Sequence, residues 1–197
     1  MRILAALLLV IALGAATPMS QSQTANQVDE LGARYFARQL QNDYYLRTEL
    51  GKPVETIRPL SLANAQDDAA FAQEILDGLK SVDPATLDHD RWLTYRTLQY
   101  LASNDVAGAK YFWLRQQATP YAGGSVLGEF STIFATFTFK DAADAQRYVA
   151  LLKQYAAYVG SIGDLLEGQH RRGIILPDIE TDAAQAVFAG YSTPDAT

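Results

Sequence analysis

The chain has 197 residues, of which 49% are hydrophobic, 19% charged and 11% aromatic. This composition is typical of a globular protein and excludes a disordered one, and the length suits one domain with a sizeable core. A net charge of −6 argues against a nucleic-acid surface or an anionic membrane as partner. Cysteine is absent, which excludes disulfides and thiolate metal ligands.

The N-terminus has the layout of a secretory signal peptide. A short positive start precedes an apolar run from Ile3 to Leu13, which is too short to span a bilayer as a stable helix. Small residues follow, and cleavage after Ala16 fits the usual spacing. We therefore predict a signal peptide over residues 1–16 and an exported protein, periplasmic or secreted, without a membrane anchor after cleavage. The alternative is a buried N-terminal helix.

Residues 17–27 are polar and predict a flexible leader. A first helix is expected over 25–49, where Val28, Leu31 and Tyr35 share one face. Residues 50–63 contain one glycine and two prolines, which predict an extended connection.

Asn64 is the expected N-cap of the next helix, whose apolar face includes Ile75 and Leu79. Asp83 and Pro84 suit the start of another helix. Asn104-Asp105 and Gly108 predict a break, followed by a short helix over 109–117.

Residues 119–124 predict a turn, and residues 125–139 a helix followed by an extended piece. Asp141 then caps a long helix that ends near Gly173. Gly160 and Gly163 inside this helix predict close contact with another helix, and 182–188 begin one more. The buried stripe expected on the long helix comprises Tyr148, Leu151, Leu152, Tyr155, Val159, Ile162 and Leu166. The fold class is therefore all-α, an irregular multi-helix bundle.

No complete catalytic or metal-binding set is present in the sequence. Glu167 and His170 share a helix face, but carboxylate-bridged metal proteins need further ligands. His89, the only other histidine, lies between two aspartates that suit a helix N-terminus. Glu129 and Glu167 are available as an acid and base, although two glutamates are usually solvated. No Gly-x-Ser-x-Gly motif occurs.

Two features leave alternatives open. Aromatic residues crowd the segment Tyr111–Trp113 and recur at Tyr121, which indicates either core packing or the lining of a ligand site. Arg171 and Arg172 lie at the end of the long helix. They either complement the helix dipole or hold a carboxylate.

Several of these segments resemble a bacterial family known as DUF885. The matching pieces are Arg91–Leu98, Trp113–Arg115 with Thr119–Gly124, Asp144–Leu152 with Tyr148 inside, and Glu167–Ile174 followed by Leu176-Pro177. The similarity runs from about residue 30 to the end of the chain.

The resemblance implies a long, mostly helical, often exported protein with a zinc-peptidase-like His-Glu segment. This chain contains no such segment, so it resembles the N-terminal third of a family member, an incomplete part of a helical zincin-like fold, inactive alone. Zinc is expected only in full-length relatives, and no catalytic or metal-binding residue carries over. Expected partners are the remainder of the protein and a peptide substrate. Candidates for the wall of a substrate groove are Tyr121, Gln169 and Arg172. The alternative is a self-contained periplasmic α-helical binding or interaction module.

Overall fold

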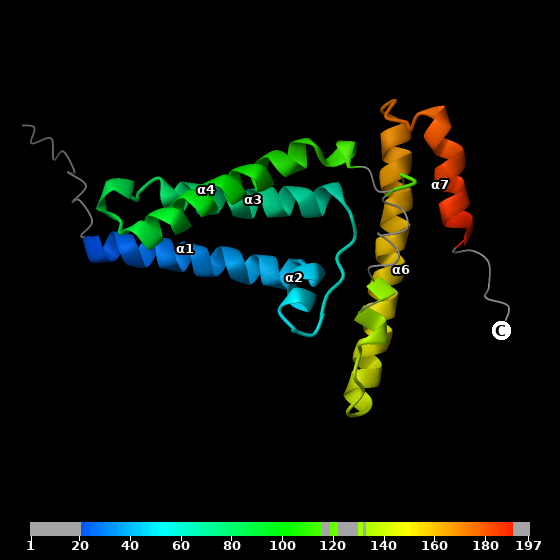
Figure 1. Ribbon diagram of the computed structural model, residues 1–197, viewed down its shortest axis with the longest axis horizontal. Helices are drawn as coiled ribbons and strands as arrows, with labels where there is room; N and C mark the ends of the chain where they lie inside the picture. The colour runs from blue at the N-terminus through cyan, green and yellow to red at the C-terminus, as the bar shows by residue number, and fades with distance from the viewer. Residues whose placement is uncertain (1–20, 116–118, 122–129, 132, 191–197) are drawn as a thin grey trace, which may run out of the picture.

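The computed structural model describes residues 21–115, 119–121, 130–131 and 133–190, and side chains from residue 24 onward. Every regular element in this part of the chain is helical, and it contains no strand (Figure 1). The all-α prediction is therefore confirmed. The predicted signal peptide, residues 1–16, lies outside the described residues.

Three long helices form a unit at the N-terminal end. They are α1 (Gln21–Asn42), α3 (Leu62–Leu79) and α4 (His89–Lys110), and α3 and α4 pack most extensively (Figure 1). The predicted α1 face is buried, because Leu31 and Tyr35 join Ile75, Leu79 and Leu98 in one core. Helix α1 begins at Gln21, so residues 21–27 are helical although the sequence predicts a flexible leader over 17–27.

The helix predicted over 25–49 is two helices, because Asp43 interrupts it. The Asp43 backbone is extended, and its carboxylate accepts hydrogen bonds from the backbone N–H groups of Tyr45 (2.9 Å) and Leu46 (3.0 Å). A short helix, α2 (Tyr44–Glu49), starts there. Local capping by an aspartate has therefore overridden the continuous helical periodicity.

Two cap predictions were wrong by a few residues. Ser61, rather than Asn64, caps α3, since its hydroxyl accepts from the Asn64 backbone N–H at 3.1 Å. Asp83 caps only the short 3₁₀ turn η1 (Pro84–Thr86), and Asp88 caps α4. In each case a better-placed short polar side chain lies close by in the sequence.

The predicted break at Asn104-Asp105 and Gly108 is also wrong. Helix α4 continues to Lys110, and the side chain of Asp105 accepts a hydrogen bond from the Tyr35 hydroxyl at 2.7 Å. Tertiary contact thus holds in the helix a residue that by itself favours turns. A 3₁₀ turn, η2 (Phe112–Leu114), replaces the helix predicted over 109–117.

The long helix is α6 (Ala142–His170), and both predicted ends are confirmed. Asp141 caps it in a capping box with Asp144. Gly173, with φ 70°, takes the left-handed conformation that follows helix ends. Before it, residues 130–131 and 133–135 are helical, as predicted, and 137–140 belong to no helix or strand, while the start of the predicted segment, 125–129, lies outside the described residues. The last helix is α7 (Asp178–Gly190), which lies beside α6 (Figure 1).

The buried stripe of α6 is rotated relative to the predicted one. Leu151 and Ile162 are buried as expected, but Leu152, Val159 and Leu166 are exposed. Tyr158 and Leu165 are buried in their place. The predicted close helix contact at Gly160 and Gly163 is not seen, because a Cβ atom at either position would meet no described residue within 4 Å.

The extended connection predicted over 50–63 ends at Ser61 and binds the three-helix unit to α6. The backbone N–H of Ile57 donates to the Gln154 side chain at 2.7 Å, and that of Leu60 donates to the Ser161 hydroxyl at 2.8 Å. Ile57 is buried in a second core with Phe130 and the inner face of α6. Side chains of α6 therefore supply the hydrogen bonds that the extended backbone lacks.

Among the described residues, no helix combines the length and apolar character that crossing a membrane requires.

Asp105 carries a perturbed ionisation inside the three-helix unit. Burial raises its pKa, the hydrogen bond from Tyr35 lowers it, the charge of Asp68 raises it, and the net shift is upward. Burial also raises the pKa of Tyr35, with Asp105 adding to the effect. The folded state therefore holds a proton on Asp105 more tightly than the unfolded chain does.

We predict that Asp105→Asn removes one component of the pH dependence of stability. A raised folded-state pKa contributes stability below the ordinary value of 3.8 and loses it as the pH rises through the raised value. Urea unfolding at several pH values measures this as a difference between wild type and Asp105→Asn. Tyr35→Phe, which removes the hydrogen bond to the carboxylate, should move the loss to higher pH. A difference that does not change with pH would contradict the assignment.

Candidate functional site

The C-terminal end of α6 meets the segment that follows α4, and the contact is very close. A Cβ atom on Gly168 would lie 2.1 Å from the ring carbon Cζ3 of Trp113, so only glycine fits there. Trp113 also packs edge-on against Phe112, with ring centroids 4.9 Å apart. Phe112 is buried with Leu165 of α6. Two of the family-like segments, Trp113–Arg115 and Glu167–Ile174, are thus joined in space.

Gln169 ties the same two segments by hydrogen bonds. Its side-chain amide nitrogen donates to the backbone carbonyls of Trp113 (2.9 Å) and Arg115 (2.5 Å). The residue is only 6% exposed. The two amide protons therefore bond to backbone carbonyls of the segment that follows α4. In this way a side chain of α6 satisfies carbonyls that have no partner within a helix.

Arg172 covers the exposed side of this contact. Its guanidinium carbon lies 3.8 Å from the centroid of the Trp113 ring, and its Nη1 donates to the Gly168 carbonyl at 2.8 Å. Arg171 instead pairs with Glu167, at 2.6 Å, along the helix surface. Arg172 thus stacks on an aromatic ring and donates to a carbonyl at the end of α6, which agrees with the first alternative for this arginine pair. The other N–H donors of its exposed guanidinium suit a carboxylate, which is the second alternative.

Two of the three predicted groove residues share a contact. Gln169 and Arg172 both contact Trp113, whereas the Tyr121 side chain is 84% exposed. Sequence reasoning placed Trp113 in an aromatic segment but did not identify it as the partner of Gly168 and Gln169. The unusual glycine inside a polar helix end was the available signal.

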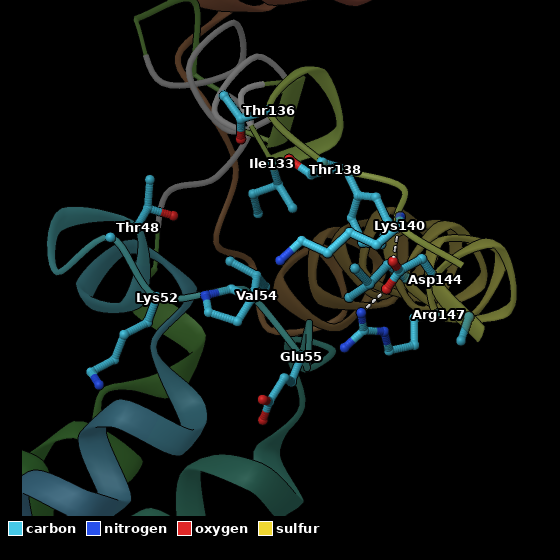
Figure 2. Close-up of a pocket in the computed structure, with 15 residues that line it drawn as sticks. Thr48, Lys52, Val54, Glu55, Ile133, Thr136, Thr138, Lys140, Asp144 and Arg147 are labelled. Atoms are coloured by element: carbon cyan, nitrogen blue, oxygen red, sulfur yellow. Dashed lines mark hydrogen bonds and ion pairs between the residues drawn. The ribbon is translucent and has the colours of Figure 1, made fainter. Parts of the chain in front are cut away.

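A cavity of about 650 Å³ lies between the turn after α2 and the first turns of α6 (Figure 2). Its walls include Val54, Phe137 and Leu151, together with Lys140 and Arg147. Figure 2 shows the Lys140 side chain extending across the cavity toward Val54, whereas Lys52 points away. An apolar wall with an inward cation is suited to a carboxylate that carries an apolar group.

The two carboxylates at this cavity are already compensated. Asp144 is buried, accepts hydrogen bonds from the backbone N–H groups of Lys140 (2.6 Å) and Asp141 (3.2 Å), and forms an ion pair with Arg147. Glu55 pairs with Arg47 at 3.1 Å. The family-like segment Asp144–Leu152 therefore begins with a capping and ion-pairing residue, not with a free acid.

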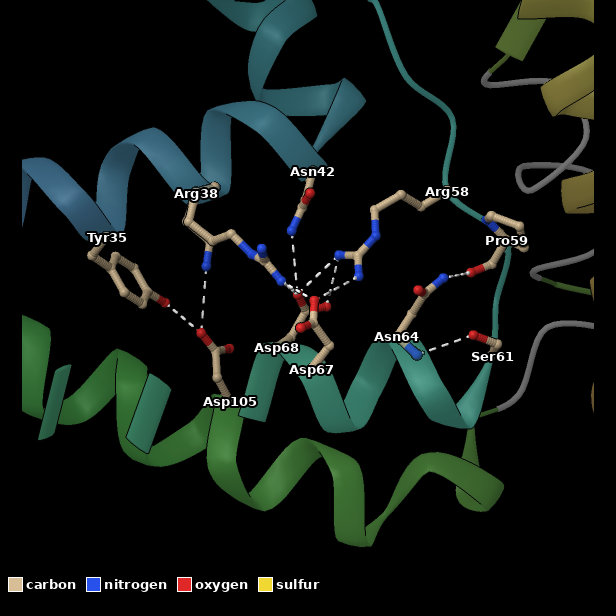
Figure 3. Close-up of polar contacts among 11 residues, drawn as sticks. Tyr35, Arg38, Asn42, Arg58, Pro59, Ser61, Asn64, Asp67, Asp68 and Asp105 are labelled. Atoms are coloured by element: carbon tan, nitrogen blue, oxygen red, sulfur yellow. Dashed lines mark hydrogen bonds and ion pairs between the residues drawn. The ribbon is translucent and has the colours of Figure 1, made fainter. Parts of the chain in front are cut away.

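A second charged cluster fixes the end of the connection, next to α3 (Figure 3). Arg58 contacts both oxygens of Asp68, at 2.9 and 3.0 Å, and Arg38 of α1 pairs with Asp67 and Asp68. Asn42 donates to Asp68 at 3.2 Å. The carboxylates of this cluster, Asp67 and Asp68, lie in the first half of α3. This network is structural, because each charge has a partner on another segment.

The described residues do not fit a zinc ion. No group of three or more histidine, cysteine, aspartate or glutamate side chains in this part of the chain is arranged to hold a metal. His89 and His170 are both exposed, at the start of α4 and the end of α6. Glu129, the other half of the glutamate pair considered above, lies outside the described residues.

These features define a class: an all-helical protein in which an extended connection and a glycine–tryptophan contact join a three-helix unit to a long helix. The model of a family described as bacterial protein of unknown function (DUF885) matches residues 45–197. The chain belongs to this family. No curated protein and no solved structure matches the chain.

We predict opposite effects for alanine at two glycines of α6. Gly168→Ala should destabilise the protein by about 1–3 kcal/mol or more, because its Cβ must displace the Trp113 ring. Gly160→Ala, the matched control, should stabilise it by about 0.5–1 kcal/mol, because the Cβ meets nothing and alanine favours helix. Urea unfolding measures both. Trp113→Leu should reduce the cost of Gly168→Ala in a double-mutant cycle. Equal effects at both glycines would be inconsistent with the contact.

Proposed function

We propose that this chain is the N-terminal helical portion of an exported, zinc-peptidase-like hydrolase of the DUF885 family. In this proposal it supplies the scaffold of a substrate groove and none of the zinc ligands. Export by the signal peptide at residues 1–16 is part of the proposal. The remainder of the longer protein and a peptide are its proposed partners.

The observation that carries the scaffold role is the use of Gln169. Both protons of its side-chain amide are engaged by backbone carbonyls, and the side chain is buried. An amide nitrogen held in this way does not act as a general acid or base. Its neighbours Gly168 and Arg172 pack against Trp113. These contacts favour a structural role for the family-like segment at the end of α6, in which it joins two parts of the chain, over a catalytic role.

Arg172 is the best-placed contributor to a groove wall. It is exposed, and the stacked Trp113 ring holds its guanidinium flat against the protein. A guanidinium fixed in this way retains donors for a peptide carboxylate at little loss of side-chain freedom. Tyr121 is exposed as well and is available on the surface for a partner.

We predict that the purified chain does not hydrolyse fluorogenic peptides, with or without added zinc, because its described residues offer no metal-binding group. The measurement is fluorescence release compared with buffer. Hydrolysis that survives a chelator and is lost on Glu167→Gln would overturn the proposal, since that outcome requires an acid or base within this chain. Zinc-dependent turnover would overturn it too.

The cavity favours a second candidate function, a self-contained binding module. Lys140 reaches into the cavity, and no hydrogen bond or ion pair joins its ammonium to another described residue. The described carboxylates that line the cavity are paired, so none of them compensates the inward charge. A small carboxylate with an apolar side chain satisfies both the ammonium and the walls of the cavity.

The binding module predicts saturable binding of N-acetyl-leucine, measured by calorimetry. Lys140→Met should weaken binding at least about tenfold, since a charge-assisted hydrogen bond contributes about 1.5–3 kcal/mol. Lys52→Met is the matched control, because Lys52 lines the same cavity but points away from it. No heat of binding, or equal affinity in the two variants, rules out this module.

A further inference from the structure

Helix α6 has a second apolar stripe that is one residue out of register with its buried stripe. We call it the outer stripe, and its members are all exposed. The exposed fractions of its large side chains are 49% for Val149, 41% for Leu152, 38% for Val159 and 38% for Leu166. The outer stripe comprises Val149, Leu152, Ala156, Val159, Gly163 and Leu166.

The spacing of the outer stripe alternates between three and four residues without interruption. That is the a/d pattern of a helix–helix seam, and it runs for about five turns, or roughly 25 Å. A Cβ atom at Gly163 or at the adjacent Gly160 would meet nothing within 4 Å. At Gly163 the seam is therefore open among the described residues, whereas at its C-terminal end Leu166 lines a pocket with Asp178 and Thr181 of α7.

We propose that the outer stripe is a docking surface for a second copy of this chain, whose α6 lies antiparallel to the first. The inference rests on self-complementarity of the stripe in size and in charge. It does not rest on the proposed hydrolase scaffold, because it concerns a different face of α6 from the one that contacts Trp113.

The size of the residues matches in the antiparallel arrangement. With the stripe turned end to end on itself, Leu152 meets Gly163 of the partner subunit, and Val159 meets Ala156 of the partner subunit. Each of these layers places a large side chain against a small one, which permits close approach of two helices. A parallel pair would instead place Gly163 against Gly163 and Leu152 against Leu152. The glycine layer would then leave a gap, and the leucine layer would be crowded.

The charges beside the stripe give the same orientation. Lys153 lies toward one end of its flank and Asp164 toward the other end, where Glu167 is already paired with Arg171. An antiparallel partner brings Lys153 of each chain toward Asp164 of the other, whereas a parallel partner sets like charges together. Opposite charges across a helix seam are the usual determinant of partner orientation.

Cross-linking at the two ends of the stripe tests the orientation, since the chain has no cysteine of its own. The variants are Val149→Cys and Leu166→Cys. In the antiparallel dimer each cysteine faces the other position and lies roughly 25 Å from its own copy. Under mild oxidation, the two variants should therefore form a disulfide dimer only when mixed. Dimers of either variant alone, or none in the mixture, would overturn the proposal.

Sedimentation equilibrium of the full chain tests the association itself, and we expect a mass twice that of one chain. Val159→Lys should weaken the dimer at least about tenfold, because it places a charge in an apolar seam. Ala157→Lys, on the same helix but away from the stripe, should leave it unchanged. Circular dichroism is the control that each variant remains folded. A monomeric wild type, indefinite aggregation, or equal effects of the two lysines would refute docking of a second copy.

Discussion

The hydrogen bonds of the Gln169 amide to the carbonyls of Trp113 and Arg115 are the constraint on which the relation between the two halves of the molecule depends. The chain leaves α4 through a 3₁₀ turn, and its carbonyls there have no helical partner. A side chain one turn before Gly173 supplies the donors, and the missing Cβ of Gly168 lets the Trp113 ring approach. Arg172 then shields the ring from solvent. Substitution of any of these residues disturbs the contact between α6 and the segment after α4. Loss of function in such a variant therefore does not by itself identify a catalytic residue.

Much of the fold could be predicted from the sequence, because helix periodicity and short polar caps are local signals. Asp141, Gly173 and the α1 face at Leu31 follow from such signals alone. The errors arise where tertiary contact competes with local preference. Asp105 stays helical because Tyr35 donates to it, and the buried face of α6 is rotated because Phe130 packs on Tyr158 rather than beside Val159. No local pattern reports which of two adjacent apolar stripes meets the core.

The sequence drew attention to Gln169 and Arg172 but not to the contact that they share. Gln169 and Arg172 were identified by motif and residue type, yet their partner Trp113 lies 56 residues from Gln169 along the chain. The Arg58–Asp68 contact shows the same limit at shorter range, since charge pairs across a turn leave no periodic signature. Tyr121 was grouped with these residues because aromatic and turn signals coincide there, and its exposure separates it from them. Sequence reasoning identifies which side chains matter, whereas packing decides what each contacts.

Helix α6 carries apolar residues on two neighbouring faces, so its apolar surface is wider than the core of the described residues covers. One face is filled by Ile57, Phe130 and the Trp113 segment. The other contains Gly163, with Gly160 nearby on the helix, and each glycine disfavours helix by about 1 kcal/mol relative to alanine. Within the described residues neither glycine is compensated by a close contact. A helix with weak intrinsic preference and a continuous exposed apolar face gains stability when that face is covered, because burial then offsets the cost of the glycines. A second copy of the chain docked on the outer stripe would supply that burial.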